Sequence, residues 1–222
     1  MNLNSQLSVL RRYYDRRAPE YEDIYNRSDR ARRDELQCAA ETMKRGLEGR
    51  NVLEIACGTG YWTRRLAGRA RAVVAVDASR EMLSIARDRS PRGAAVEYLL
   101  ADAYDLQDLA GKFDAGLAGF WLSHVPKAMM SVFLAGFHSR LETGAVVFMI
   151  DNFRRPGRGG EFIRVAGSED TFRRRELSDG SNHEIIKNYY DVEELERLLA
   201  PLCECLEVSS GAYYWWLTYR VA

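Results

Sequence analysis

The fold of this 222-residue chain is decided by residues 52–60, which read Val-Leu-Glu-Ile-Ala-Cys-Gly-Thr-Gly. A short apolar run enters a turn with two glycines, and a helix is predicted after it. Because glycine has no Cβ, the backbone at Gly58 and Gly60 allows a ligand to approach closely. The helix would direct its free N–H groups and the positive end of its dipole at that ligand. The pattern predicts a cofactor at the end of a first strand.

Three further apolar runs follow, and each ends in a polar or conformationally permissive residue. They cover residues 72–76, 96–101 and 113–120. Asp77 and Asp102 come directly after the first two of these runs. Because the carboxyl ends of parallel strands form the ligand-binding edge of an open α/β sheet, we expect both carboxylates to lie near the glycine turn.

The remainder of the chain continues this alternation of strands and helices. A fifth strand is predicted at residues 145–151, and residues 203–209 and 213–221 are predicted to complete the sheet as a hairpin. Helices between the strands predict a mostly parallel sheet with right-handed crossovers. Trp215 and Trp216 are neighbours on the last strand, so we expect them to pack on opposite faces of the sheet.

Residues 153–190 interrupt the alternation. The first part, residues 153–169, is rich in Gly, Arg and Pro and is predicted to be a loop. Alternating runs on both sides of Gly180 predict a hairpin. We interpret the whole segment as an insertion that covers the pocket. At the other end of the chain, residues 1–46 are predicted to be helical, with Asp29 as the cap of a helix.

At these residues the chain resembles the class I S-adenosylmethionine-dependent methyltransferases, over roughly residues 10–155. The resemblance implies an α/β, Rossmann-like fold with a seven-stranded, mostly parallel sheet. The last strand would be antiparallel, helices would cover both faces, and the inserted hairpin would follow strand five. It also implies a single methyltransferase domain over residues 1–222, which moves a methyl group from S-adenosyl-L-methionine to an oxygen, nitrogen or carbon atom of a small-molecule acceptor.

The resemblance assigns roles to the acids at the strand ends. In that family the first-strand acid and the glycine loop hold the methionine part of the cofactor, which implies that role for Glu54. The second and third acids, here Asp77 and Asp102, bind the ribose hydroxyls and the adenine amino group. Ala56 stands where many members carry the first glycine, and its small side chain should still let the loop form. The implied cofactor contacts are Tyr13, Tyr21, Glu54, Ala56, Gly58, Thr59, Gly60, Asp77, Ala78, Met82, Asp102, Ala103 and Phe120.

Burial gives an independent reason to single out Glu54. An acid inside a buried strand is costly unless it is paired. A cofactor ammonium group or backbone N–H groups of the glycine loop would supply that partner. We therefore expect Glu54 to serve the cofactor.

Residues 12–21 resemble the tyrosine-bearing N-terminal helix that folds over the cofactor in several small-molecule methyltransferases. Tyr13 and Tyr21 are candidates for the cofactor, and Tyr14 is a candidate for the acceptor. At least one of the three is expected only to pack this helix on the sheet. Residues 1–46 are thus expected to form a mobile lid.

His124 is the candidate catalytic base, because it follows the fourth strand at the ligand edge and histidine titrates near neutrality. The alternative is that its ring hydrogen-bonds a loop and shapes the pocket wall. Methyl transfer is an in-line displacement, so the protein must align the acceptor atom with the methyl carbon and exclude water. A wall of aromatic side chains with a few polar groups favours a small molecule over a polymer. The acceptor-side candidates are Tyr14, Trp121, Asp151, Asn152 and Tyr189.

The amino-acid composition limits the classes of binding partner that we expect. The chain has 32 basic and 32 acidic residues, and a formal net charge of zero argues against a nucleic-acid or anionic-membrane surface. Arg173, Arg174 and Arg175 could bind an anion, but we interpret them as a solvated face. The four cysteines suggest neither a metal site nor a disulfide framework. Without a membrane-spanning run or a secretory signal, a cytoplasmic protein is expected, and its oligomeric state is open.

Three rival functions remain. An NAD(P)-binding Rossmann oxidoreductase would carry a third glycine where this chain has Thr63, and it would give Glu54 and Asp102 no role. A nucleic-acid amino-methyltransferase would carry an Asp/Asn-Pro-Pro-aromatic motif, where this chain has Gly-Phe-Trp-Leu at residues 119–122. A cofactor-binding module without catalysis would look much the same in sequence.

Overall fold

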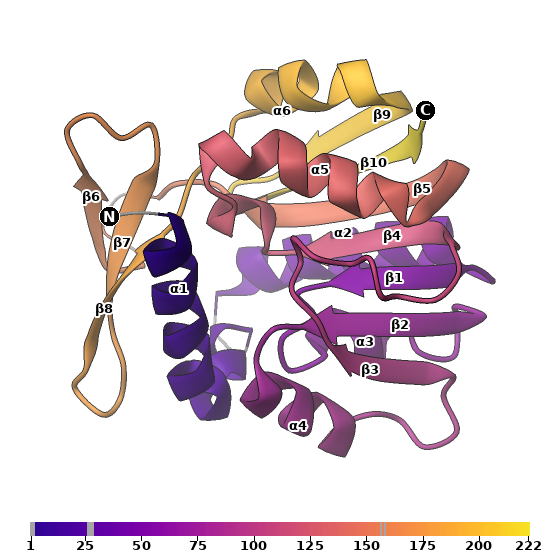
Figure 1. The fold of residues 1–222 in the computed structure, drawn as a ribbon, viewed down its shortest axis with the longest axis horizontal. Coiled ribbons are helices and arrows are strands. Elements are labelled where there is room, and N and C mark those ends of the chain that lie inside the picture. Colours follow the sequence, from indigo (N-terminus) through magenta and orange to yellow (C-terminus); the bar gives the residue numbers. More distant parts are fainter. Residues whose placement is uncertain (1–2, 26–28, 156, 158) are drawn as a thin grey trace.

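The computed structural model describes residues 3–25, 29–155, 157 and 159–222. Residues 1–2 and 26–28 of the predicted lid, and residues 156 and 158 of the predicted loop, lie outside the described residues. Within the described part, the strands form one sheet of seven strands and one sheet of three strands. Figure 1 shows the small sheet to one side of the large one, with helix α1 (Leu3–Arg17) between them.

The large sheet has the strand order β3-β2-β1-β4-β5-β10-β9. Strand β10 is antiparallel to both of its neighbours, and the pairings from β3 across to β5 are parallel. This arrangement confirms the predicted seven-stranded fold. The strands are β1 (Asn51–Ile55), β2 (Ala72–Asp77), β3 (Val96–Leu100), β4 (Phe113–Gly119), β5 (Leu141–Asn152), β9 (Cys203–Ser210) and β10 (Tyr214–Val221).

Helices connect the strands and cover both faces. Asp29 caps its helix as predicted, because its side chain accepts a hydrogen bond from the N–H of Arg32, an interaction that stabilises a helix by about 1 kcal/mol. The helices after α1 are η1 (Ala18–Ile24), α2 (Arg30–Leu47), α3 (Tyr61–Leu66), α4 (Arg80–Asp88), η2 (Leu122–His124), η3 (Lys127–Met129), α5 (Met130–Ser139), α6 (Val192–Leu199) and η4 (Ala200–Leu202), where η marks a 3-10 helix.

Two apolar cores lie on the two faces of the large sheet. Helices α5 and α6 contribute Phe133 and Leu195 to one core, together with Trp215. Helices α2, α3 and α4 supply buried side chains to the other core, together with Trp216. The neighbouring tryptophans of β10 therefore pack on opposite faces, as the strand period predicts.

The inserted segment forms the small sheet. Strands β7 (Thr171–Glu176) and β8 (Asn182–Ile186) pair antiparallel, which confirms the predicted hairpin. The predicted loop over residues 153–169 is wrong in part, because β6 (Glu161–Arg164) pairs with β7. Leu10 and Tyr13 of α1 pack against the buried side chains of this sheet. Helix α1 thereby joins the small sheet to the carboxyl edge of the large one (Figure 1).

None of the helices in the described part of the chain combines the length and the apolar character that crossing a membrane requires.

Candidate active site

A cavity of about 480 Å³, here called the large cavity, lies at the carboxyl ends of β1 to β4 and under α1. Strand ends deliver polar groups to it from one side, and α1 delivers apolar side chains such as Leu7 and Leu10 from the other. The sequence-predicted residues on its wall are Tyr14, Tyr21, Ala56, Gly58, Asp77, Ala78, Met82, Asp102, Ala103, Phe120, Trp121 and His124.

Asp77 organises the turn at this edge. Its Oδ2 accepts a hydrogen bond from the N–H of Gly58 at 2.8 Å, and its Oδ1 accepts one from the N–H of Ser79 at 2.9 Å. Burial raises the pKa of the Asp77 carboxyl to about 6. Each carboxylate oxygen has more than one acceptor site, so Asp77 can hold the loop and bind ligand hydroxyl groups at the same time.

The turn after β1 adopts left-handed backbone angles. Gly58 has φ of 57°, and Ala56 has φ of 50°. Ala56 is the position at which many class I methyltransferases carry a glycine. An alanine in this region costs about 1–2 kcal/mol. A Cβ at Gly58 would lie at an ordinary 3.5 Å from the Tyr21 ring. Glycine is therefore favoured at position 58 by backbone angle rather than by lack of space.

Three predicted cofactor residues lie beneath the turn and line neither of the two cavities described here. Glu54 is buried, and its Oε2 accepts a hydrogen bond from the Thr63 hydroxyl at 2.6 Å. Burial raises the pKa of Glu54 to about 8, so the carboxyl is protonated at neutral pH. Thr59 donates its hydroxyl to Glu22. A Cβ at Gly60 would lie 3.3 Å from that of Ala86, which explains the glycine by helix packing.

The wall of the large cavity carries polar groups that lack partners. Asp102 accepts the N–H of Tyr104 on Oδ1, and its Oδ2 has no partner among the described residues. The Tyr104 hydroxyl and the Trp121 indole N–H are buried without a hydrogen-bond partner in that part of the chain. Buried polar groups are normally satisfied. A ligand with polar atoms, such as a nucleoside, fits this wall, and the described residues contain no cluster suited to a metal ion.

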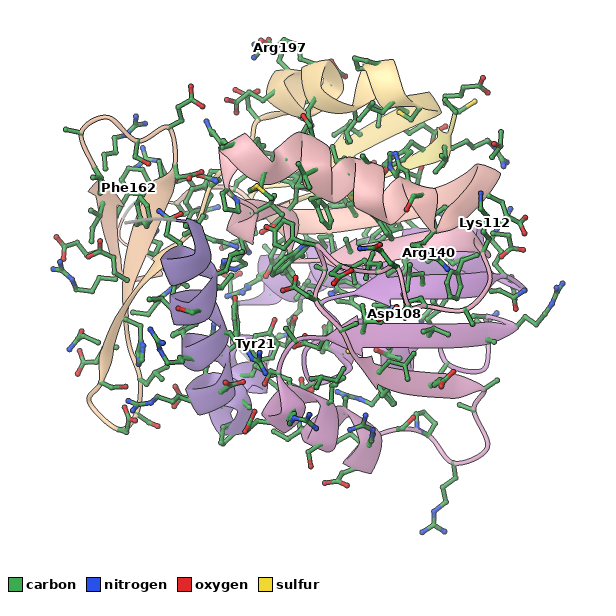
Figure 2. All side chains as sticks on the ribbon, in the orientation of Figure 1. Tyr21, Asp108, Lys112, Arg140, Phe162 and Arg197 are labelled. Atoms are coloured by element: carbon green, nitrogen blue, oxygen red, sulfur yellow. The ribbon has the colours of Figure 1, made fainter. Side chains whose placement is uncertain are left out.

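A second cavity of about 120 Å³, here called the small cavity, adjoins the first. Tyr14, Tyr21, Phe120 and His124 line both cavities and therefore form their common boundary. Figure 2 shows Tyr21 between α1 and the large sheet. Of the predicted acceptor residues, Asn152 and Tyr189 line the small cavity, whereas Trp121 lines only the large one. The wall also carries six cations: Arg17, Arg32, Arg155, Arg173, Arg175 and Lys187.

His124 is buried and engaged at both ring nitrogens. Nδ1 lies 2.7 Å from the carbonyl oxygen of Ile186, so it carries the proton and donates it. Nε2 lies 2.7 Å from the Tyr14 hydroxyl and accepts its hydrogen. Burial lowers the pKa of His124 well below its usual value, and burial raises that of Tyr14. The ring is therefore neutral and can accept a proton only after Nε2 has released Tyr14.

The three successive arginines of β7 lie on two different faces of the strand. Arg173 and Arg175 point to the small cavity, while Arg174 is exposed and pairs with Glu161 at 2.6 Å and Glu184 at 3.4 Å. The interpretation as a solvated face is thus correct for Arg174 and wrong for its two neighbours. The strand period of two was the available signal.

Two of the predicted site residues line neither cavity and contact other parts of the protein instead. Asp151 is buried and accepts hydrogen bonds from the N–H of Ser123 and from Lys187, whose Nζ lies at 2.9 Å. Tyr13 is 1% exposed and packs with the small sheet, as was expected for at least one tyrosine of this helix.

Several wall residues were not predicted from the sequence. Arg17 had an available signal, because it follows Tyr13 by one helical turn. Arg32, Arg155, Lys187, Tyr213 and Tyr214 come from elements far apart in the chain and carried no local signal.

The sequence is similar to those of known methyltransferases. Residues 52–144 match the family described as "Methyltransferase domain". A ubiquinone biosynthesis O-methyltransferase of Xanthomonas axonopodis pv. citri is 30% identical over 168 residues, which cover 75% of this chain and 67% of that enzyme. A demethylmenaquinone methyltransferase of Lactococcus lactis is 36% identical over 94 residues, but this match covers only 37% of that enzyme.

Solved structures agree with the sequence comparisons. The structure described as "DhpI-SAH complex structure" has a TM-score of 0.80 and 28% identity, and the match covers 100% of this chain and 99% of that one. The "DhpI-SAM-HEP complex" has a TM-score of 0.78 and 28% identity, with 99% and 100% of the two chains covered.

Proposed function

Since this chain belongs to the class I S-adenosylmethionine-dependent methyltransferase family, we propose that its large cavity holds the cofactor and its small cavity holds a small-molecule acceptor. The chain is an S-adenosylmethionine-dependent methyltransferase. One observation carries the assignment of the two cavities. Four residues line both of them, so a molecule in the small cavity would face the ligand in the large cavity across a shared boundary.

On the cofactor side, Asp77 accepts the ribose hydroxyls and Oδ2 of Asp102 accepts the adenine amino group. Ala56 and Gly58 bring the backbone close to the methionine part. The supporting observations are the position of these residues on one wall and the unpartnered polar atoms beside them. Glu54, Thr59 and Gly60 serve the site indirectly, because they hold the turn and the following helix in place.

On the acceptor side, the residues of this chain orient the acceptor and exclude water. Bound S-adenosylmethionine supplies a methyl group on a sulfonium, whose neutral thioether is a good leaving group. Tyr14, Tyr21 and Phe120 surround the boundary where the acceptor atom must align with the methyl carbon. The Tyr14–His124 hydrogen bond holds both rings in position. A proton-accepting role for His124 remains a prediction. Its ring is neutral and hydrogen-bonded at both nitrogens, which favours a role in positioning the acceptor.

The acceptor itself is proposed to be small. A cavity of about 120 Å³ suits a small molecule better than an extended polymer. The Xanthomonas relative is named for ubiquinone biosynthesis and the Lactococcus relative for demethylmenaquinone. The full chain, residues 1–222, would then act as one domain, in which residues 1–46 and 153–190 cover the two cavities.

Two measurements test this assignment. S-adenosylhomocysteine, but not NADH, should raise the melting temperature of the protein, because only the former fits a methyltransferase cofactor site. A screen of small molecules, with formation of S-adenosylhomocysteine as the readout, should then find an acceptor. Methylation of proteins or nucleic acids, with no turnover of any small molecule, would contradict the proposed acceptor class.

A further inference from the structure

Cations and tyrosines make up most of the lining of the small cavity. Its described wall contains six cationic side chains and no carboxylate. One of the six, Lys187, pairs with the Asp151 carboxylate. Arg32 and Arg155 donate to uncharged oxygens, the Tyr214 hydroxyl and the carbonyl of Ala212. The other three are Arg17, Arg173 and Arg175.

These three guanidinium groups have no carboxylate partner in the part of the chain that the structure describes. Arg173 is 3% exposed and donates only to the Tyr189 hydroxyl and the Gly160 carbonyl. Nε of Arg175 is buried with no partner among these residues. Arg17 lies over the rings of Tyr13 and Tyr21, with its Cζ 5.5 and 5.1 Å from the ring centres. Burial of a cation without a counter-charge is costly.

The neighbouring arginine shows that this pattern is local to the cavity. Arg174, between Arg173 and Arg175 on β7, faces away from the cavity and pairs with two glutamates. Among the described residues, carboxylates thus pair with the exposed side of the strand, and none lines its cavity side. A bound molecule is the remaining source of negative charge for the buried Arg173 and for the half-buried Arg17 and Arg175.

We propose that the methyl acceptor is a small oxyanion, a carboxylate or a phosphate or phosphonate, that is methylated on its charged oxygen. This inference rests on the proposed function and names the substrate class of the same site. Guanidinium groups bind such oxyanions through two parallel N–H···O bonds. Because the cavity is small and its boundary with the large cavity includes Tyr14 and Tyr21, an oxyanion held by these arginines lies next to the methyl group.

An ionised oxygen also needs no catalytic base. An oxygen lone pair of the acceptor forms the new bond to the methyl carbon, the methyl–sulfur bond breaks, and its electron pair stays on sulfur. The ionised oxygen carries no proton, so none has to be removed. This agrees with His124, which is neutral and hydrogen-bonded at both nitrogens. The product is a methyl ester.

Binding is tested by calorimetry on the full chain saturated with S-adenosylhomocysteine. Sodium acetate and methylphosphonate are the anionic probes, and acetamide is the neutral probe of similar shape. We expect at least one anion to bind and acetamide not to bind. Arg175→Gln should weaken anion binding by about 10- to 100-fold, the scale for a lost hydrogen bond to a charged group, whereas Arg174→Gln should leave it within about twofold. Arg17→Gln, on a different element, provides a second variant if Arg175→Gln does not fold.

The two anions separate the two possible sources of the oxyanion. Tighter binding of acetate assigns a carboxylate acceptor, and tighter binding of methylphosphonate assigns a phosphate or phosphonate. Equal binding of acetamide and both anions would overturn the inference, and so would equal losses in Arg174→Gln and Arg175→Gln. Turnover gives a second criterion, because mild base cleaves a carboxylate methyl ester and does not cleave a methyl ether. A methyl group on a phosphate or phosphonate oxygen is identified instead by the coupling of its protons to phosphorus in the NMR spectrum of the product. Failure of the parent protein to bind S-adenosylhomocysteine would instead contradict the assignment of the cofactor cavity.

Discussion

The assignment of Asp77 to the cofactor predicts a pH-dependent affinity for S-adenosylhomocysteine. Only the ionised carboxylate can accept hydrogen bonds from the loop N–H groups and the ribose hydroxyls on both oxygens. Its pKa of about 6 therefore places the change at mildly acidic pH. If the ligand requires the ionised form, the dissociation constant rises about tenfold from neutral pH to pH 5, or about 1.4 kcal/mol. Protonation of Asp77 removes a hydrogen-bond acceptor from the site, so the affinity for S-adenosylhomocysteine falls as the pH falls.

The assay is calorimetric titration with S-adenosylhomocysteine from pH 7.5 to pH 5. Asp77→Asn removes the titrating group and should bind more weakly, by about 2–4 kcal/mol for the lost charged hydrogen bonds, with little dependence on pH. Asp15→Asn is the matched control, since the negative charge of Asp15 contributes to the raised pKa of Asp77. That variant should keep the pH dependence with a lower midpoint. A parent protein whose affinity is the same at pH 5 and pH 7.5 would refute the reasoning.

Three other predictions concern stability, catalysis and motion. The pKa of Glu54 is about 8 in the folded protein and about 4.3 in the unfolded chain. The free energy of unfolding should therefore fall by up to about 1.4 kcal/mol per pH unit as the pH rises between these two values. Urea unfolding should show this slope in the parent protein and not in Glu54→Gln. His124→Asn should lower kcat by less than about tenfold in steady-state assays at saturating S-adenosylmethionine, and a loss near 100-fold would restore a base role. Amide hydrogen exchange in residues 3–25 should slow with S-adenosylhomocysteine, and unchanged exchange would argue against a lid.

Local sequence signals predicted the framework and much of the wall of the large cavity. The glycine turn, Asp77 and Asp102 were placed correctly on one cavity because parallel strands align their carboxyl ends. The faces of Trp215 and Trp216 followed from the strand period alone. The sequence could not show that Glu54 bonds Thr63 instead of reaching the cavity, because the direction of a buried side chain depends on its three-dimensional neighbours.

The small cavity, which we propose as the acceptor site, was much less predictable. Its wall combines residues from α1, α2, the end of β5, the small sheet and the start of β10. Arg17 and Arg175 are 158 positions apart in the chain, and no local pattern brings them to one wall. Strand β6 was also missed, because residues 153–160 before it are rich in glycine and arginine and its pairing partner lies in the later hairpin.

The shared boundary formed by Tyr14, Tyr21, Phe120 and His124 has a consequence for the energetics of binding. Any shift of these side chains that improves the fit of one ligand also changes the cavity offered to the other. The two dissociation constants are then linked, and thermodynamic reciprocity requires that each ligand change the affinity of the other by the same factor. Two cavities that share a boundary in this way can discriminate between acceptors according to which cofactor form is bound. S-adenosylmethionine and S-adenosylhomocysteine in the large cavity would then favour different molecules in the small cavity.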